Sequence, residues 1–226
     1  MNSILSKRLL TIASMIPSGK VVYDVGCDHA YLDIYLTLNN HNKCYAIDVR
    51  KPVVEIAKKN IEKFNLDIPV ILNNGIDKIK LQDNSIVVIA GMGTRTILKI
   101  LQNKNIDEIL IQSNDDLPLL RETLSNNGYV ITEEKVIFEA NYYYVLIKFK
   151  KGKIKYTKEE LLLGPILMHE NNEVYLNYLK HLTNKFTKMA LDVPATFLEK
   201  KNKLLLNVNI ITKYLDKLKW HFRMSF

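Results

Sequence analysis

Short apolar runs alternate with amphipathic stretches along residues 1–150 of this 226-residue chain. The apolar runs read VVYDVG, KCYAIDV, PVILNNG, SIVVIAG and EILIQSN. Most of the segments between them carry apolar residues at helical spacing, as in VVEIAKKNIEKF and TRTILKILQN. Strands separated by helices favour a parallel sheet covered by helices on both faces, so we expect an α/β fold.

Two further segments, YVITEEKVIFEA and YYYVLIKFK, predict a pair of strands joined by the short link 139–141. A crossover helix does not fit in so short a link, so these strands should pair antiparallel at the edge of the sheet. An amphipathic helix with apolar positions from Ile4 to Met15 should precede the first strand and end at Pro17.

The character of the chain changes at residues 150–155, where the basic, glycine-broken segment KKGKIK predicts a domain boundary. Beyond it, Thr157 and Glu160 have the spacing of a helix capping box. Two long apolar stripes then fit an antiparallel, coiled-coil-like helical hairpin. We therefore expect an α/β domain over residues 1–155 and a helical hairpin over residues 156–226.

Positive charge is concentrated in the last third of the chain. Residues 1–150 contain 18 Lys and Arg against 17 Asp and Glu, whereas residues 151–226 contain 14 against 7. Nearly all of the net charge of +8 therefore lies in the expected hairpin. Such asymmetry suggests a polyanionic partner, with nucleic acid ahead of a membrane surface. A solvated, lysine-rich helical face that binds nothing is the alternative.

Other classes of protein fit the sequence less well. No apolar run approaches the roughly 20 residues that cross a bilayer, and the first residues make a poor signal peptide, so we expect a cytoplasmic protein. The cysteines Cys27 and Cys44 form no CxxC pair, and His29 does not complete a metal-ligand spacing with them, so we expect no metal. We expect two buried thiols in a reducing compartment; one disulfide is the alternative.

The sharpest motif is DVGCDHA at residues 24–30, between the first strand and the following helix. Small residues at this turn let the backbone approach a nucleotide, and GxGxxG is the usual dinucleotide pattern. Here Asp24 and Asp28 flank Gly26, and their carboxylates would repel a phosphate but attract an ammonium group. The motif therefore favours S-adenosylmethionine over NAD or ATP. An ordinary strand-to-helix turn with an Asp cap is the alternative.

Acidic and amide residues follow the next two strands. Asp48 lies 24 residues beyond Asp24, close to the interval of about 20 residues expected for an acid that binds ribose hydroxyls. Val49 follows it directly. Asn74 and Gly75 end the third strand, where the adenine of the cofactor would lie, and an amide can both donate to and accept from adenine. A plain Asn-Gly turn is an equally good local reading.

The fourth and fifth strands end in AGMG at residues 90–93 and in QSN at residues 112–114. Ligands of open α/β sheets lie outside the carboxyl ends of the strands. The two glycines of AGMG leave room for a flat group against the backbone, and the QSN segment should lie beside it.

Taken together, these motifs resemble those of the bacterial tRNA (adenine-22-N1)-methyltransferases over almost the whole chain. The shared segments are LSKRL at 5–9, DVGCDHAYL at 24–32, AGMG at 90–93, Gln112 with Asn114, and GPIL at 164–167. The departures from the family pattern are Asn73-Asn74-Gly75 for GDG, Thr94 after AGMG, Asp33 for the proline after HAYL, and Ser113 for a proline.

The resemblance implies a Rossmann-like class I methyltransferase sheet with an antiparallel last strand, and a C-terminal helical domain that helps to hold tRNA. The reaction would transfer a methyl group from S-adenosylmethionine to N1 of adenine 22. That nitrogen has an in-plane lone pair, so positioning rather than a strong base should drive the transfer, and we assign no general base. The target adenine should leave its stack to react.

We assign the candidate site residues in three groups. The target base should contact Gly91, Met92 and Asn114. The cofactor should contact Asp24, Gly26, Cys27, Asp28, His29, Asp48, Val49, Asn74, Gly75, Ala90 and Gly91. The tRNA, bound by a monomer, should contact Arg8, Tyr31, Lys180, Lys185 and Lys188.

Three other functions remain open on the sequence. The first is a methyltransferase for another RNA, a protein or a small molecule, against which the basic hairpin argues. The second is a non-catalytic RNA-binding protein on the same fold, but an empty site has no use for Asp24, Asp28 and Asp48. The third is an NAD-dependent oxidoreductase, which the acid at position 28 disfavours.

Overall fold

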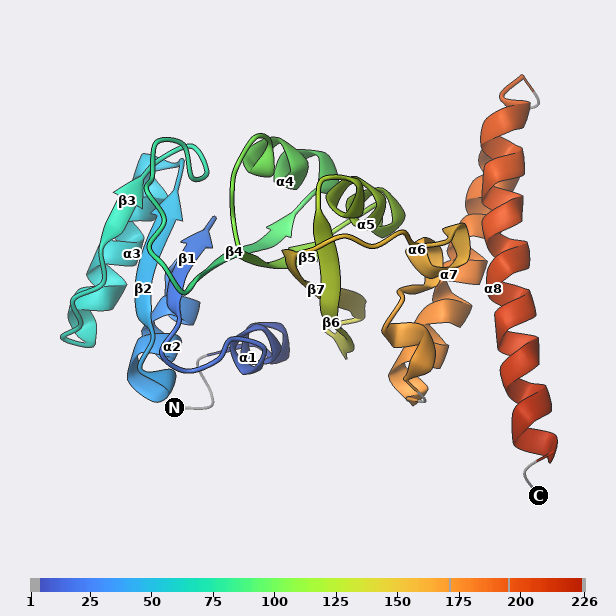
Figure 1. The fold of residues 1–226 in the computed structure, drawn as a ribbon, viewed down its shortest axis with the longest axis horizontal. Coiled ribbons are helices and arrows are strands. Elements are labelled where there is room, and N and C mark those ends of the chain that lie inside the picture. The colour runs from blue at the N-terminus through green and yellow to red at the C-terminus, as the bar shows by residue number, and fades with distance from the viewer. Residues whose placement is uncertain (1–4, 171, 195, 225–226) are drawn as a thin grey trace. The chain divides into compact units, whose positions relative to one another are not determined.

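The computed structural model describes residues 5–170, 172–194 and 196–224 (Figure 1). The chain divides into two compact units, Met1–Lys155 and Tyr156–Phe226. The first unit combines helices with a sheet, and the second contains only helices and turns in its described residues. Within the described ranges, no helix is both long enough and apolar enough to span a membrane.

One seven-stranded sheet forms the centre of the first unit, in the order β3-β2-β1-β4-β5-β7-β6. Its strands are β1 (Val21–Val25), β2 (Lys43–Asp48), β3 (Val70–Leu72), β4 (Ser85–Met92), β5 (Glu108–Ser113), β6 (Tyr129–Glu139) and β7 (Tyr142–Lys151). Strands β1 to β5 pair in parallel, and β7 pairs antiparallel with both β5 and β6. The predicted α/β sheet and its antiparallel last strand are thus confirmed, with β7 inserted between β5 and β6.

Helices cover both faces of this sheet. They are α1 (Lys7–Ser14), α2 (Tyr31–Asn40), α3 (Lys51–Lys63), α4 (Thr94–Leu101) and α5 (Leu117–Asn126). Ile86 and Val88 of β4 share one core cluster with residues of α1, α2 and α3. Val87 and Ile89 point to the other face and are also fully buried. This two-sided burial explains why the strands are continuous apolar runs in the sequence.

The first helix begins later than its apolar pattern suggested. The side chain of Ser6 accepts a hydrogen bond from the Leu9 N–H and so caps α1. The predicted apolar position Ile4 lies outside the described residues. At its other end, α1 stops at Ser14, and Met15 is its C-cap residue.

The strand order reverses between β1 and β4. From β1 the chain adds β2 and β3 on one side, and then crosses to place β4 on the other side of β1. Their carboxyl ends therefore flank a topological switch point, where open α/β sheets bind their ligands. The first unit thus brings the turn after β1 next to the end of β4.

The second unit is built around two long helices, α7 (Glu173–Asp192) and α8 (Leu198–Met224), which lie side by side in Figure 1. Phe186, Ala190, Val193 and Leu204 pack together near the connection between them. Far from that connection, the rings of Tyr175 and Tyr214 meet edge to face with centroids 6.4 Å apart. The two helices therefore form the predicted antiparallel hairpin.

Two short elements precede the hairpin, α6 (Lys158–Leu163) and the 3-10 helix η1 (Leu167–His169). Thr157 and Glu160 form the predicted capping box at the start of α6. The Tyr175 hydroxyl of α7 donates to the Leu163 carbonyl at 3.1 Å, and the Tyr214 hydroxyl of α8 donates to the Met168 carbonyl. These bonds attach both long helices to the segment that leads into them.

A buried ion pair between Arg121 of α5 and Glu134 of β6 provides a test of the first unit's stability. Both side chains are almost fully buried, and Nε of Arg121 lies 2.8 Å from Oε1 of Glu134. Replacing Glu134 with Gln removes the negative charge that is hydrogen-bonded to the buried guanidinium, so urea unfolding should show a loss of about 3–5 kcal/mol. The control is Glu55→Gln, which breaks an exposed pair with Lys58 and should cost under about 1 kcal/mol. Equal losses in the two variants would contradict the expectation.

Candidate functional site

The turn after β1 is tight and is tied to the neighbouring strand. The N–H groups of Gly26 and Cys27 both donate to the Ile47 carbonyl of β2, at 2.8 and 3.0 Å. Gly26, Asp28 and Ala30 have φ values of 81°, 51° and 57°, which few residues other than glycine adopt readily. The sequence pattern DxGxDxA therefore encodes a strained, fixed turn that exposes its backbone at the switch point.

The turn contacts the end of β4 through Met92. A Cβ atom added to Gly26 would lie 2.4 Å from Cε of Met92, which is too close for any real contact. A side chain at position 26 would therefore displace the Met92 methyl group from its place over the turn. This contact joins a residue predicted to hold the cofactor with one predicted to hold the target base.

Asp24 is a buried acid at the end of β1. Burial raises its pKa to about 7, a hydrogen bond from the Asp33 side chain acts in the opposite direction, and the nearby acids Asp48 and Asp28 raise it further. Arg8 also lies close enough to lower this pKa. Asp24 can therefore carry a negative charge near neutral pH, and a cation placed beside it would stabilise that charge.

Asp48 is held by the arginine that follows it. Oδ1 of Asp48 accepts from the Arg50 backbone N–H at 2.9 Å and from its Nε at 3.0 Å, and Oδ2 accepts from the guanidinium at 3.0 Å. Burial alone would raise the pKa of Asp48, but these hydrogen bonds lower it below the usual value. The guanidinium also lies 3.7 Å from the exposed Asp28 carboxylate. Arg50 is a site residue that the sequence analysis missed.

His29 and Tyr31 lie beyond the turn, at the start of α2. His29 is exposed, with Nε2 3.8 Å from Oδ1 of Asp28 and its ring tilted against Tyr31 at 5.9 Å. Tyr31 is partly buried and packs against the hydrophobic core. Cys27 and Cys44 are free, buried thiols, as predicted, and burial raises the pKa of both.

The segment after β3 lies beside the end of β2. The Asn73 N–H donates to the Asp48 carbonyl at 3.0 Å, and the Asn73 side chain donates to the Gly75 carbonyl, also at 3.0 Å. Gly75 is buried at a φ of 62°, and a Cβ atom there would lie 2.9 Å from the Ile100 side chain. Asn74 is exposed, and Val49 leaves 61% of its surface exposed. An open apolar surface therefore adjoins the acid at the end of β2.

A ring of hydrogen bonds connects the ends of β4 and β5. Oε1 of Gln112 accepts from the Gly91 N–H at 3.1 Å, and its amide nitrogen donates to Oδ1 of Asn114 at 3.0 Å. The Asn114 amide then donates back to the Gly91 carbonyl at 2.8 Å. From the sequence, Gln112 is expected to lie beside this site, but its role there is not evident. The structure shows that it fixes the orientation of Asn114.

Arg8 of α1 joins the same ring from outside the sheet. Its guanidinium donates to Oε1 of Gln112 at 2.7 Å and lies over the Tyr144 ring, 5.4 Å from the centroid. The Arg8 backbone N–H donates to Glu139 at 3.1 Å, and the Lys7 N–H also donates to that carboxylate. Arg8 is therefore a partly buried residue of the site, and its side chain is held on two sides.

Two of the departures from the family pattern form one interaction. The hydroxyls of Thr94 and Ser113 lie 2.8 Å apart, and both side chains are buried. Thr94 also donates from its backbone N–H to Oδ1 of Asp115 at 2.7 Å. The polar residue at each position thus provides a partner for the other, and the ends of β4 and β5 stay joined.

The remaining predicted substrate residues, Lys180, Lys185 and Lys188, are exposed on α7 of the second unit. The amine of Lys180 donates to the Asn177 side chain at 3.3 Å. Within the described part of the chain, no three His, Cys, Asp or Glu side chains are arranged to hold a metal ion.

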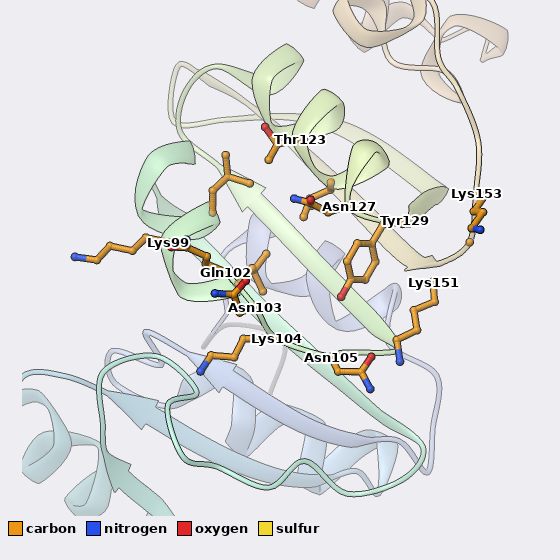
Figure 2. Close-up of a pocket in the computed structure, with 15 residues that line it drawn as sticks. Lys99, Gln102, Asn103, Lys104, Asn105, Thr123, Asn127, Tyr129, Lys151 and Lys153 are labelled. Carbon is orange, nitrogen blue, oxygen red and sulfur yellow. The ribbon is translucent and has the colours of Figure 1, made fainter.

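A separate cavity of about 900 Å³ lies at the other end of the sheet (Figure 2). It is lined by the last residues of α4 and α5, the start of β6 and the end of β7, including Lys99, Asn103, Asn127, Tyr129 and Lys151. It contains none of the predicted site residues. Because α4 runs back from the carboxyl end of β4, this cavity lies near the amino ends of the parallel strands.

The chain matches known methyltransferases in sequence. The family profile described as "Methyltransferase domain" matches residues 5–147. A Bacillus subtilis relative named tRNA (adenine(22)-N(1))-methyltransferase is 32% identical over 187 residues, which cover 76% of this chain and 78% of the relative.

Solved structures agree with the sequence matches. TrmK from M. capricolum, in complex with S-adenosyl-homocysteine, is 35% identical with a TM-score of 0.83, over 94% of this chain and 98% of that one. Sp1610 from Streptococcus pneumoniae, in complex with S-adenosyl-L-methionine, is 29% identical with a TM-score of 0.83, over 94% of this chain and 100% of that one.

The hydrogen-bond ring at β4 and β5 predicts a measurable contribution from Gln112. Its side chain is buried, and Gln112→Leu removes the acceptor used by the Gly91 N–H and by Arg8. Unfolding by denaturant should show a loss of about 1–3 kcal/mol, because partly buried donors are left unpaired. The exposed Gln102 after α4 provides the control, since Gln102→Leu should change stability by about 0.5 kcal/mol or less. A Gln112 variant as stable as the control would argue against the ring as a structural element.

Proposed function

Because the chain belongs to the family of tRNA (adenine-22-N1)-methyltransferases, we propose that it transfers a methyl group from S-adenosylmethionine to N1 of adenine 22 in tRNA. The observation that carries the proposal is the Gly26–Met92 contact at the switch point. It brings an acid-lined turn suited to a cationic amino group next to an open glycine suited to a flat base. We further propose that the protein acts as a cytoplasmic monomer.

The residues at the ends of β1, β2 and β3 fit S-adenosylmethionine. Asp24 and Asp28 supply negative charge for its ammonium group, and the Asp48 carboxylate accepts from ribose hydroxyls. Arg50 already engages both Asp48 oxygens, so the ribose must share or displace its hydrogen bonds. The proposed contacts are completed by Gly26, Cys27, His29, Val49, Asn74, Gly75, Ala90 and Gly91. When bound, the cofactor supplies an electrophilic methyl group on its sulfonium.

The ends of β4 and β5 fit the target base. Gly91 is exposed at a φ of 81°, so its backbone is open to a flat ring. Oδ1 of Asn114 has one lone pair beyond its bond from Gln112 and can accept from the 6-amino group of adenine. Met92 lies between this position and the turn after β1. Orientation of the N1 lone pair supplies most of the acceleration, and no general base is required.

Each unit carries basic side chains that can bind the phosphates of a polyanion such as tRNA. Lys180, Lys185 and Lys188 give α7 an exposed basic surface for backbone phosphates. In the first unit, Arg8 orients Asn114 through Gln112 and leaves further guanidinium N–H groups for a phosphate or a base. Tyr31 presents part of its ring beside His29, where a base can stack.

Nucleoside analysis tests this function directly. The protein is incubated with labelled S-adenosylmethionine and unmodified bacterial tRNA, and we expect N1-methyladenosine to form. A tRNA with guanine at position 22 should accept no label. Label on that tRNA, or on protein alone, would overturn the assignment of adenine 22. Cofactor binding without any transfer to tRNA would leave the acceptor to be sought elsewhere.

Gly26 and Gly19 have similar backbone angles. Substituting each of them distinguishes the effect of backbone strain from the effect of a contact with the ligand. Gly26→Ala and Gly19→Ala both place a Cβ at positive φ, at 81° and 77°, and each should cost about 1–2 kcal/mol of stability. Only at Gly26 does the new methyl group meet Met92 and the proposed cofactor position; around Gly19 no atom lies within 4 Å. Calorimetry should therefore show S-adenosyl-homocysteine binding weakened at least about tenfold in Gly26→Ala alone. Equal affinities in the two variants would remove the turn from the binding site.

The lysines of α7 should determine part of the salt dependence of tRNA binding. Replacing Lys180, Lys185 and Lys188 together with Ala should reduce the slope of log affinity against log salt by about 2. Replacing Lys59, Lys63 and Lys80 of the first unit removes the same charge from exposed positions outside the proposed contacts. Slopes measured by filter binding should change in the α7 variant and stay near the wild-type value in the control. An unchanged slope in the α7 variant would exclude these lysines as phosphate contacts.

A further inference from the structure

A second buried acid lies behind the proposed ammonium site. Asp33, in the first turn of α2, has no exposed surface, and its carboxyl group lies close enough to that of Asp24 for a hydrogen bond if one of the two is protonated. Apart from its own backbone N–H, no donor among the described residues reaches either carboxyl oxygen of Asp33. Two carboxylate groups have no proton to share, so a hydrogen bond between them requires that one be protonated.

The surroundings determine which acid keeps the proton. Burial and the negative charge of Asp24 raise the pKa of Asp33 well above the usual value, whereas Asp24 has a pKa of about 7. The cation Arg8 of α1 acts on Asp24. The other titratable groups around the pair are Asp28 and Cys27 in the turn, and Asp48 and Cys44 on β2. None of these groups supplies a positive charge to Asp33, so Asp33 is the acid that stays neutral.

We propose that Asp33 is a positioning residue: a buried carboxylic acid that remains protonated and donates a hydrogen bond to the Asp24 carboxylate. The pair then carries a single negative charge, on Asp24, and this charge receives the ammonium group of the cofactor. The inference deepens the proposed function and rests on its assignment of Asp24 to the ammonium group. It gives a role to a residue that the sequence analysis had noted only as a substitution for proline.

The proposal determines how cofactor affinity depends on pH. The ammonium group binds the ionised form of Asp24, so affinity should be constant well above pH 7 and fall as the pH decreases through about 7. By linkage, affinity for S-adenosyl-homocysteine should fall about fifteenfold between pH 7 and pH 5.5 in the wild type.

Two substitutions distinguish a neutral donor from a buried charge. Asp33→Asn keeps a neutral donor of the same shape, so its S-adenosyl-homocysteine affinity and pH midpoint should match those of the wild type. Asp33→Leu removes the hydrogen bond that lowers the pKa of Asp24, so the midpoint should rise by about one pH unit and affinity at pH 7 should fall about fivefold. Asp67→Asn, which removes an exposed acid, is the control for loss of a carboxyl group and should leave the profile unchanged.

Titration calorimetry from pH 5.5 to 8.5 provides these profiles, and thermal melts establish that each variant is folded. If Asp33→Asn shifts the midpoint as far as Asp33→Leu does, the donor role is wrong. If neither variant changes the profile, Asp33 does not act on Asp24 and the proposal is overturned.

A measurement without ligand separates this inference from the proposed function. Infrared spectra at pH 8 should show the carbonyl band of one protonated carboxylic acid in the wild-type protein and lose it in Asp33→Asn. Loss of the band supports the inference even if the cofactor assignment fails. Its absence from the wild-type protein contradicts the inference even if the cofactor binds.

Discussion

The contact between Gly26 and Met92 is the interaction on which the rest of the site depends. It holds the turn after β1 against the end of β4, where the strand order reverses. Two hydrogen bonds to the Ile47 carbonyl fix the same turn to β2. A side chain at position 26 would displace the end of the Met92 side chain, because its Cβ would lie 2.4 Å from Cε of Met92. The pairing of β1 with β4 brings the proposed cofactor and base positions together, and Gly26 leaves room for the Met92 side chain between them.

Polar side chains, rather than apolar packing, join the ends of β4 and β5. Gln112 bridges Gly91 and Asn114, and Arg8 extends the connection to α1. Such a ring sets the direction in which each amide presents its donors and acceptors, which apolar contacts cannot do. At the neighbouring position, the hydroxyls of Thr94 and Ser113 also join the ends of β4 and β5 by a hydrogen bond. Both residues depart from the family pattern, and the hydroxyl of each provides a hydrogen-bond partner for the other.

The acids of the first unit differ in environment, and their charges differ accordingly. Asp48 is buried but ion-paired with Arg50, which lowers its pKa, whereas burial raises the pKa of Asp24. Asp28 remains exposed in the turn between them. The ends of β1 and β2 and the turn after β1 thus carry a fixed carboxylate, a titrating carboxylate and a solvated one. Their environments, and not their residue type, suit them to different groups of one ligand.

The sequence by itself determined the alternation of strands and helices, the antiparallel final pair, the helical hairpin and the loops that carry the site, since apolar periodicity and turn residues are local signals. Asp24, Asp48, Gly91 and Asn114 could be identified because each lies at or just beyond the carboxyl end of a strand. Tertiary structure alone decided that Gln112 bridges to Arg8, 104 residues away, and that Asp33 faces Asp24. Such partners depend on how separate elements pack, and neither spacing nor composition records which side chains then share a proton or an acceptor.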